Sequence, residues 1–393
     1  MNNRELFHAT MKHENGNQLL HMEQGFNIVY KQWKKDGLPK NVEDTNFPTL
    51  SKSLNLFDYM NATGYLYCMF DQFCIPPFDE EILSESSDRK TYRNSQGVTL
   101  MERTVPAVEG TNSCGLPHEI DFTIKTIVDY QKNRYRFIGN IEDRIDDLWI
   151  QQNAEAHRTQ QDFLTALWVN GPFGFLRNII GNVNAMILPY YEPEMIEMML
   201  SDHLETSMAA AEKIIRACKP DMCFIWEDCC GRTGPFIAPE IFDKFMAPWY
   251  REWKSYLKSL GVHWLVLDTD GNPSPLVTRW YEAGVDCMLP WEVNAVDMLK
   301  FAEEYPHYTM MGGIYKHMFE PGDPSQVGRF KSTDYKKAID EELERVVKPM
   351  TKRGGYIAAL DHWAFWGTTF DGYKHYRERL CDYGKANVSK RFK

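Results

Sequence analysis

The sequence predicts an α/β fold, specifically one decorated (β/α)8 TIM barrel that spans residues 1–393, with an N-terminal extension and an inserted hairpin. A chain of 393 residues is long for one ordinary domain but fits a barrel with additions. In its second half, a helical stretch repeatedly ends at Gly or Pro, and the short apolar run that follows ends at an acidic residue. Apolar runs without alternation are typical of strands buried on both faces of a parallel sheet. Their alternation with helices predicts a right-handed βα succession.

The number of apolar runs favours a barrel over an open doubly wound sheet, because eight candidate strands can be placed along the chain. They are Leu19–Glu23, Tyr65–Phe70, Phe163–Val169, Met222–Trp226, His263–Leu267, Asp286–Pro290, Tyr308–Ile314 and Tyr356–Leu360.

The region between the second and third candidate strands is longer than a βα unit needs, and it predicts an insertion or extension over residues 75–140. Within it, Tyr92–Arg103 has a polar turn at Asn94-Ser-Gln-Gly97 and predicts a β-hairpin. Long helices are expected at Ile145–Thr159 and Glu240–Leu260, and Pro248 should kink the second of them.

Composition and missing motifs exclude several classes of function. The chain has 44 Lys and Arg against 55 Asp and Glu, a net charge of −11, and no cluster of basic residues for nucleic acid. No apolar run approaches the ~20 residues of a membrane span, and Met1–Gln18 is too polar for a signal peptide. Nine cysteines are an odd number for a disulfide framework, so we expect a cytoplasmic protein. GxSxG, P-loop and GxGxxG motifs are absent, which argues against serine hydrolases, P-loop NTPases and Rossmann dehydrogenases.

Acidic residues follow four of the candidate strands, at Glu227-Asp228, Asp268-Thr-Asp270, Glu292 and Asp361-His362. The carboxyl ends of barrel strands build the active site, so these side chains should converge at one mouth. So many carboxylates repel one another unless a cation, a proton or a substrate balances them. The alternative is that each acid only caps the helix or turn that follows it.

The residues at this mouth fall into three groups of candidates. Asp268 and Asp270 are two apart and point the same way on a strand, and with Glu292 and His362 they would form a zinc site with an open position. A metal-free acid–base cluster is the alternative. The catalytic candidates are Glu227, Asp228, Asp270, Glu292 and His362, and the substrate-binding candidates are His21, Trp226, Asn272, Trp291, Lys316, Asp361 and Trp363.

Six stretches together resemble the uroporphyrinogen decarboxylase superfamily, which includes corrinoid-dependent methyltransferases. The stretches are Ile225-Trp-Glu-Asp228, Gly234-Pro-Phe-Ile-Ala-Pro-Glu240, Leu267-Asp-Thr-Asp-Gly-Asn272, Leu289-Pro-Trp-Glu292, Met311-Gly-Gly-Ile314 with Lys316, and Gly354-Gly-Tyr-Ile-Ala-Ala-Leu-Asp-His362. The resemblance covers most of the chain and implies a (β/α)8 barrel, in agreement with the strand count.

The segment after the first strand distinguishes branches of this superfamily. Decarboxylases carry an arginine-rich segment there that clamps the carboxylates of a porphyrinogen, whereas His21-Met-Glu-Gln-Gly-Phe-Asn27 has no arginine. Tyr30-Lys-Gln-Trp-Lys-Lys-Asp-Gly-Leu-Pro39 is similar to the start of the methyltransferase components of corrinoid-dependent O-demethylases. This resemblance implies transfer of a methyl group from a methoxylated aromatic to the Co(I) corrinoid, a cobalamin carried by a separate protein.

The strand ends differ from the zinc pattern of the thiol-methylating relatives, which use a His-x-Cys pair and a Cys on the last strand. Asp268-Thr-Asp270 and Asp361-His362 stand in those places here. An oxygen-rich site suits an ether oxygen better than a thiolate. The expected partners are therefore a corrinoid protein and a small aromatic methyl ether, with a homodimer left open. A decarboxylase-like lyase, a methyltransferase for methylamines or methylthiols, and a non-catalytic binding barrel are the alternatives.

Overall fold

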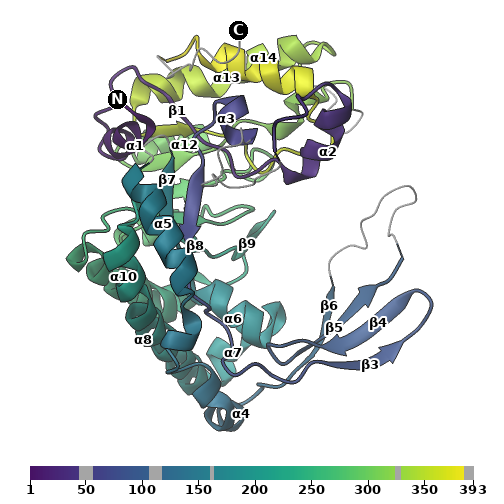
Figure 1. The fold of residues 1–393 in the computed structure, drawn as a ribbon, viewed down its shortest axis with the longest axis vertical. Coiled ribbons are helices and arrows are strands. Elements are labelled where there is room, and N and C mark those ends of the chain that lie inside the picture. The colour runs from purple at the N-terminus through teal and green to yellow at the C-terminus, as the bar shows by residue number, and fades with distance from the viewer. Residues whose placement is uncertain (44–55, 106–116, 160–162, 324–328, 385–393) are drawn as a thin grey trace.

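The computed structural model describes residues 1–43, 56–105, 117–159, 163–323 and 329–384, and its central feature is a closed barrel of eight parallel strands (Figure 1). The strands pair in the order β1-β14-β13-β12-β11-β8-β7-β2, and a parallel bridge between Met22 and Thr63 joins the two end strands. They are β1 (Leu20–His21), β2 (Tyr65–Cys68), β7 (Leu164–Asn170), β8 (Met222–Trp226), β11 (Leu265–Asp268), β12 (Cys287–Leu289), β13 (Thr309–Met311) and β14 (Tyr356–Ala358). Each overlaps one of the eight predicted runs, so the predicted fold class is confirmed.

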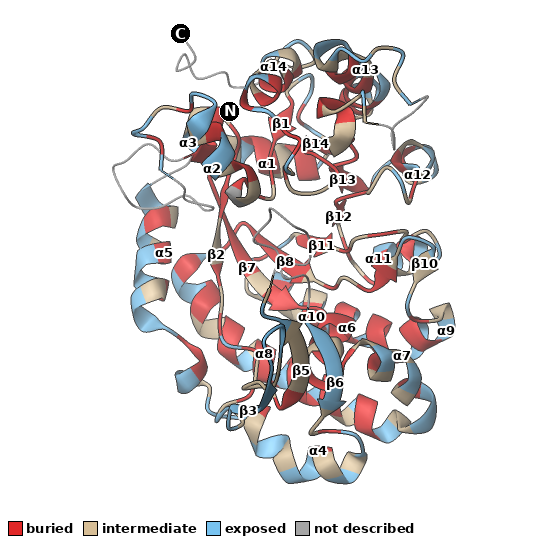
Figure 2. Ribbon diagram, turned by 90° about the vertical axis from the view of Figure 1, so that its right-hand side faces the viewer, coloured by how far each residue is buried: buried red, intermediate tan, exposed pale blue. Residues whose placement is uncertain are grey.

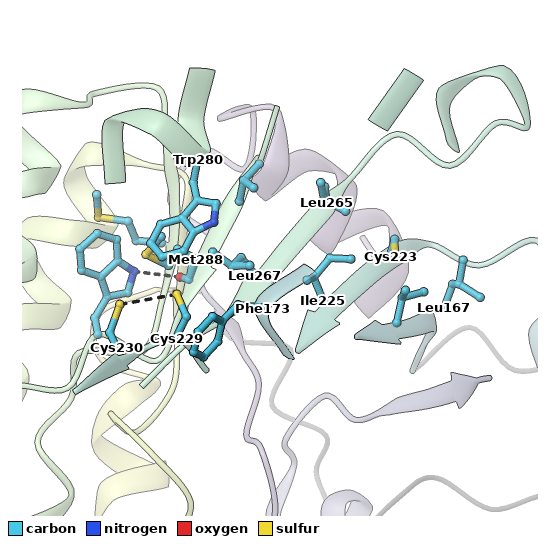
Figure 3. Packing of buried hydrophobic residues seen from close by; sticks show 14 of the residues in the cluster. Leu167, Phe173, Cys223, Ile225, Cys229, Cys230, Leu265, Leu267, Trp280 and Met288 are labelled. Atoms are coloured by element: carbon cyan, nitrogen blue, oxygen red, sulfur yellow. Dashed lines mark hydrogen bonds between the residues drawn. The ribbon is translucent and has the colours of Figure 1, made fainter. Parts of the chain in front are cut away.

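The barrel strands are apolar on both faces because each face packs against a different cluster. Side chains such as Met222, Phe224 and Val266 fill the barrel interior. Their neighbours Ile225 and Leu267 point to the opposite side and pack beneath the surrounding helices (Figure 3). Continuous burial of this kind removes the period-2 pattern that a half-exposed strand would show.

Helices cover the outside of the barrel, buried where they face the strands and exposed on the other side (Figure 2). The predicted helix Ile145–Thr159 is α5 (Asp147–Thr159). The other described barrel-side helices are α6 (Pro172–Ile180), α7 (Asn182–Tyr191), α8 (Pro193–Cys218), α11 (Val277–Glu282), α12 (Met298–Glu304), α13 (Tyr335–Arg353) and α14 (Phe370–Leu380).

The predicted helix Glu240–Leu260 is interrupted rather than simply kinked. It consists of α9 (Pro239–Ile241), a π-helical turn (Phe242–Met246) and α10 (Ala247–Ser259). Pro248 has no backbone N–H to donate, and the wider turn directly before it accommodates the missing hydrogen bond.

The N-terminal end of the barrel is closed by α1 (Asn3–Met11), whose Leu6 and Phe7 side chains belong to the interior cluster. Two interactions fix the helix there. Arg4 pairs with Asp221, just before β8, at 3.1 Å, and the Trp264 indole, just before β11, donates to His8 Nδ1 at 2.9 Å. A ligand therefore has access from the opposite end. The other short helices before β7 are α2 (Asn27–Lys35), α3 (Leu56–Met60) and α4 (Ile127–Asn133).

The insertion forms an antiparallel sheet that projects from the side of the barrel (Figure 1). Its strands are β3 (Glu81–Glu85), β4 (Arg89–Arg93), β5 (Val98–Arg103) and β6 (His118–Phe122), paired in chain order. The predicted hairpin is β4–β5, whereas β3 and β6 were not predicted. Almost every residue of these two outer strands is exposed, so no alternation of buried and exposed residues marks them. None of the described helices is long and apolar enough to cross a membrane.

Candidate active site

A cavity of about 350 Å³ lies at the C-terminal end of the barrel, opposite α1. Its walls come from inward-facing residues of β2, β7, β8 and β11 and from the segments that follow β1, β8, β11 and β14. The lining residues are Gln24, Tyr65, Tyr67, Trp168, Phe224, Trp226, Asp228, Asp268, Asp270, His362 and Trp363. An apolar cavity with a few convergent polar groups is the usual form of a small-molecule site.

Asp268, the last residue of β11, lies deepest among the acids of this cavity. Burial raises the pKa of its carboxyl group well above the usual value, and the nearby charges of Asp270 and Asp228 raise it further. Within the described part of the chain, no hydrogen bond holds this carboxyl group in its ionised form. These conditions favour a neutral carboxylic acid that has a proton to donate.

Asp270 and His362 lie nearer the mouth, with His362 Nε2 3.4 Å from Asp270 Oδ2. Both side chains keep more than a third of their surface exposed. Both side chains therefore reach solvent, and Asp270 lies close enough to Asp268 for its charge to raise the pKa of that carboxyl group.

Asp228 is balanced from outside the cavity by Arg177 of α6. The Arg177 guanidinium donates to Asp228 Oδ2 at 2.5 Å and lies 5.1 Å from the centroid of the Trp226 ring. Asp228 also has a left-handed backbone with φ of 45°. A non-glycine residue held in this region is strained, and such strain is found preferentially at functional sites.

Glu227 lies on the other side of the barrel wall, because successive side chains of a strand point to opposite faces. It is fully buried, and its Oε2 accepts a hydrogen bond from the backbone N–H of Gly174 at 3.1 Å. Burial raises its pKa to about 7. A Cβ on Gly171 would lie 1.9 Å from the same oxygen, so glycine is needed there for α6 to approach. The structure does not bring this predicted catalytic residue into the cavity.

Glu292, Lys316 and Asp361 hold together the loops that follow β12, β13 and β14, and none of them lines the cavity. Glu292 accepts from the backbone N–H of Gly271 at 2.8 Å and lies 3.5 Å from Lys316 Nζ. The buried Asp361 accepts from the backbone N–H groups of Val293 and Lys316, at 3.0 and 2.8 Å. Their positions indicate a role in fixing the loops around the mouth.

Of the remaining substrate-binding candidates, Trp226 and Trp363 line the cavity, and three lie outside it. The His21 ring is buried and lies 2.8 Å from Glu23 Oε1. The Trp291 indole donates to the Met288 carbonyl at 2.8 Å within the core. Asn272 Oδ1 accepts from the backbone N–H of Ser274 and so stabilises a turn.

Several cavity residues were missed at the level of sequence. Tyr65 and Tyr67 lie two apart on β2, as Phe224 and Trp226 do on β8, and each pair points inward. Pairs of aromatic residues at a spacing of two near a strand end were the signal that could have found them. Trp168 of β7 completes this wall, with its ring centroid 6.4 Å from that of Tyr67.

The predicted zinc ligands Asp268, Asp270, Glu292 and His362 do not assemble into a metal site. Among the described residues there is no group of three or more His, Cys, Asp or Glu side chains that could hold a metal ion. Asp270 and His362 are within reach of one ion, but Glu292 is turned to Gly271 and Lys316. This arrangement does not fit a four-ligand zinc site.

Fold and site together define a (β/α)8 barrel with an acidic, aromatic cavity at the mouth used by barrel enzymes. No protein-family model matches the chain. No curated protein matches it either. Among solved structures, the chain is similar to a methyltransferase from Methanosarcina mazei, with a TM-score of 0.59 and 12% sequence identity. The similarity covers 97% of this chain and 98% of that one, which shows that the two share a fold over their whole length.

Proposed function

We propose that this protein is a methyltransferase that takes the methyl group of a methoxylated aromatic compound and passes it to the Co(I) corrinoid of a separate protein. The observation that carries the proposal is the position of Asp268, a carboxyl group with a raised pKa at the bottom of an aromatic cavity. The fold shared with a methyltransferase and the sequence resemblance support the same class of reaction.

The reaction needs a proton at the ether oxygen. When the bond between methyl carbon and oxygen breaks, its electron pair stays on the oxygen, and phenolate is a poor leaving group. A neutral Asp268 can donate its proton to that oxygen as the bond breaks, which gives a phenol and an aspartate. The cobalt of the partner's corrinoid is the nucleophile, and it receives the methyl group in place of the aryl oxygen.

The other cavity residues have matching roles in this proposal. Trp168, Trp226 and Trp363 offer flat apolar surfaces to the aromatic ring. Gln24 lines the cavity, and its buried amide nitrogen has no hydrogen-bond partner within the described residues, so we assign it as a donor to a ring oxygen. The methyl group then points to the open mouth, where Asp270 and His362 return a proton to Asp268.

A second candidate is suggested by the same cavity, because aromatic rings and carboxylates also bind methylated ammonium groups. A methylamine donor would leave as an amine and would not need protonation by a deep carboxylic acid before it departs. A carboxylic acid at the position of Asp268 therefore favours an aryl methyl ether over a methylamine as the methyl donor.

The proposal is tested by incubating the purified chain anaerobically with free cob(I)alamin and 2-methoxyphenol. We expect equimolar catechol and methylcobalamin, measured by chromatography and by the visible spectrum. The same assay with tetramethylammonium tests the second candidate. Folded protein that forms neither product with any of several methoxybenzenes would contradict the proposal.

A further inference from the structure

The charge of the cavity distinguishes between classes of methoxylated aromatics. Three carboxyl groups, Asp228, Asp268 and Asp270, line it, and among the described lining residues there is no Lys or Arg. The guanidinium group of Arg177, which contacts the lining residue Asp228, is already paired with that carboxylate at 2.5 Å. The Lys316 ammonium group lies 3.5 Å from Glu292, outside the lining.

A substrate that carries its own carboxylate would add a further negative charge to this cavity. His362 is the one described lining group that can become cationic, and Asp270 Oδ2 already lies 3.4 Å from its Nε2. The Gln24 amide can donate a hydrogen bond, but a neutral amide does not balance a full charge in a poorly solvated site.

An aromatic ring without a carboxylate brings no unbalanced charge into the cavity. Aromatic side chains form most of the wall, and the volume of about 350 Å³ is at the small end of ligand cavities, which suits a single ring. A hydroxyl or ether oxygen on that ring can accept from Gln24 and from a protonated Asp268.

We propose that the cavity selects methoxylated aromatics without a carboxylate, namely methoxyphenols and dimethoxybenzenes, and rejects methoxybenzoates. This inference rests on the proposed function and narrows its substrate class. Specificity of this kind comes from an unbalanced charge in the wrong ligand rather than from an extra contact in the right one.

Calorimetric titration of the purified chain with three ligands tests the selection. The ligands are 2-methoxyphenol, 4-hydroxy-3-methoxybenzoate and 4-hydroxy-3-methoxybenzamide, and the last two differ in charge but hardly in size. We expect the benzoate to bind at least about tenfold more weakly than the amide at neutral pH, which corresponds to one modest unbalanced charge interaction. Equal or tighter binding of the benzoate would overturn the proposal.

Two variants test whether the difference in affinity between the benzoate and the amide arises in this cavity. Asp270→Asn removes one cavity charge and frees His362 for a ligand carboxylate, so it should reduce the difference between benzoate and amide severalfold. Glu282→Gln removes one charge from an exposed position on α11 and should leave that difference unchanged. An unchanged difference in Asp270→Asn would overturn the assignment to this cavity.

The methyl-transfer assay separates this inference from the proposed function. Demethylation of the benzoate as fast as of 2-methoxyphenol would overturn the charge selection and leave the methyltransferase standing. Absence of both binding and transfer with all three ligands would overturn both.

Discussion

Trp226, Glu227 and Asp228 are consecutive in the chain, yet they lie in two different environments. Trp226 and Asp228 line the cavity, while Glu227 is buried on the outer side of the barrel beneath α6. The carboxyl groups of Asp268 and Asp270, two residues apart, both face the cavity. At the scale of the residue, the direction of the side chain therefore decides which acids meet a substrate.

The contrast between Asp268 and Glu227 gives the first prediction, because both carboxyl groups have raised pKa values but only one lies in the cavity. Asp268→Asn should lower the rate of methyl transfer by about 10²-fold or more, the usual contribution of general acid catalysis. Glu227→Gln is the matched control, and its rate should stay within a few-fold of the wild type. In the wild type, the rate should fall as pH rises through the pKa of Asp268, because the acid loses its proton. An equal loss of methyl-transfer rate in both variants would contradict the assignment of Asp268 as the general acid.

Glu23 gives a second prediction, which concerns stability. It is buried beside His21, Tyr373 and Tyr376, and burial raises its pKa to about 8. An unfolded glutamate is ionised above about pH 4.5, so the unfolded chain releases a proton that the native chain keeps. The native state should therefore lose stability as pH rises to about 8, by at most about 1.4 kcal/mol per pH unit.

Glu23→Gln keeps an oxygen that accepts hydrogen bonds and cannot ionise. In urea unfolding from pH 5 to pH 8, the unfolding free energy of the wild type should fall relative to that of this variant as the pH rises. Parallel curves would show that Glu23 is already ionised in the native protein. His21 acts in the opposite direction below about pH 6.5, because burial lowers its pKa and the unfolded chain binds a proton there that the native ring does not. The wild type and the variant share His21, so the difference between their two curves isolates the contribution of Glu23.

At the scale of the element, the strands that sequence could predict are those buried on both faces. β7, β8 and β11 are nearly continuous runs of apolar residues, and such runs have few alternative explanations. β3 is exposed throughout and is held by pairing with β4 rather than by burial. Its residues therefore show no hydrophobic pattern that would predict a strand. The acidic strand ends were predictable, but which of them would face the cavity depended on the register.

The projecting sheet β3–β6 gives a third prediction, because its ends lie side by side at the barrel. A Cβ on Gly97 would touch both the Phe78 ring and the Thr123 hydroxyl at 2.9 Å. Replacing residues 80–122 by a short Gly-Ser linker should therefore leave the barrel folded. The hydrogen bond that the backbone N–H of Asn182 donates to Glu119, at 3.0 Å, is one interaction that this replacement removes.

We expect this variant to have an unfolding free energy within about 2 kcal/mol of the wild type and unchanged affinity for 2-methoxyphenol. Urea unfolding followed by circular dichroism measures the unfolding free energy, and calorimetry measures the affinity for 2-methoxyphenol. A collapsed or aggregated product would show that the sheet supports the barrel directly.

At the scale of the whole molecule, the barrel has one closed and one open end, and distant parts of the chain make both. Residues 4 and 8 of α1 reach residues 221 and 264 at the closed end. At the open end, residues 24, 67, 268 and 362 line one cavity. Such long-range closure has no signature in a local window of sequence, which is why α1 and Gln24 were not assigned these roles in advance.

The closed end gives the last prediction. Phe7 is fully buried and belongs to the same interior cluster as Phe224, which also lines the cavity. Phe7→Ala should lower the unfolding free energy by about 3–5 kcal/mol, the usual cost of removing a buried aromatic ring. Lys12→Ala, at the exposed end of the same helix, should change it by less than about 0.5 kcal/mol. Because the floor of the cavity rests on this cluster, Phe7→Ala should also weaken binding of 2-methoxyphenol, whereas Lys12→Ala should not. Loss of stability without any loss of affinity would mean that the two ends of the barrel are energetically independent.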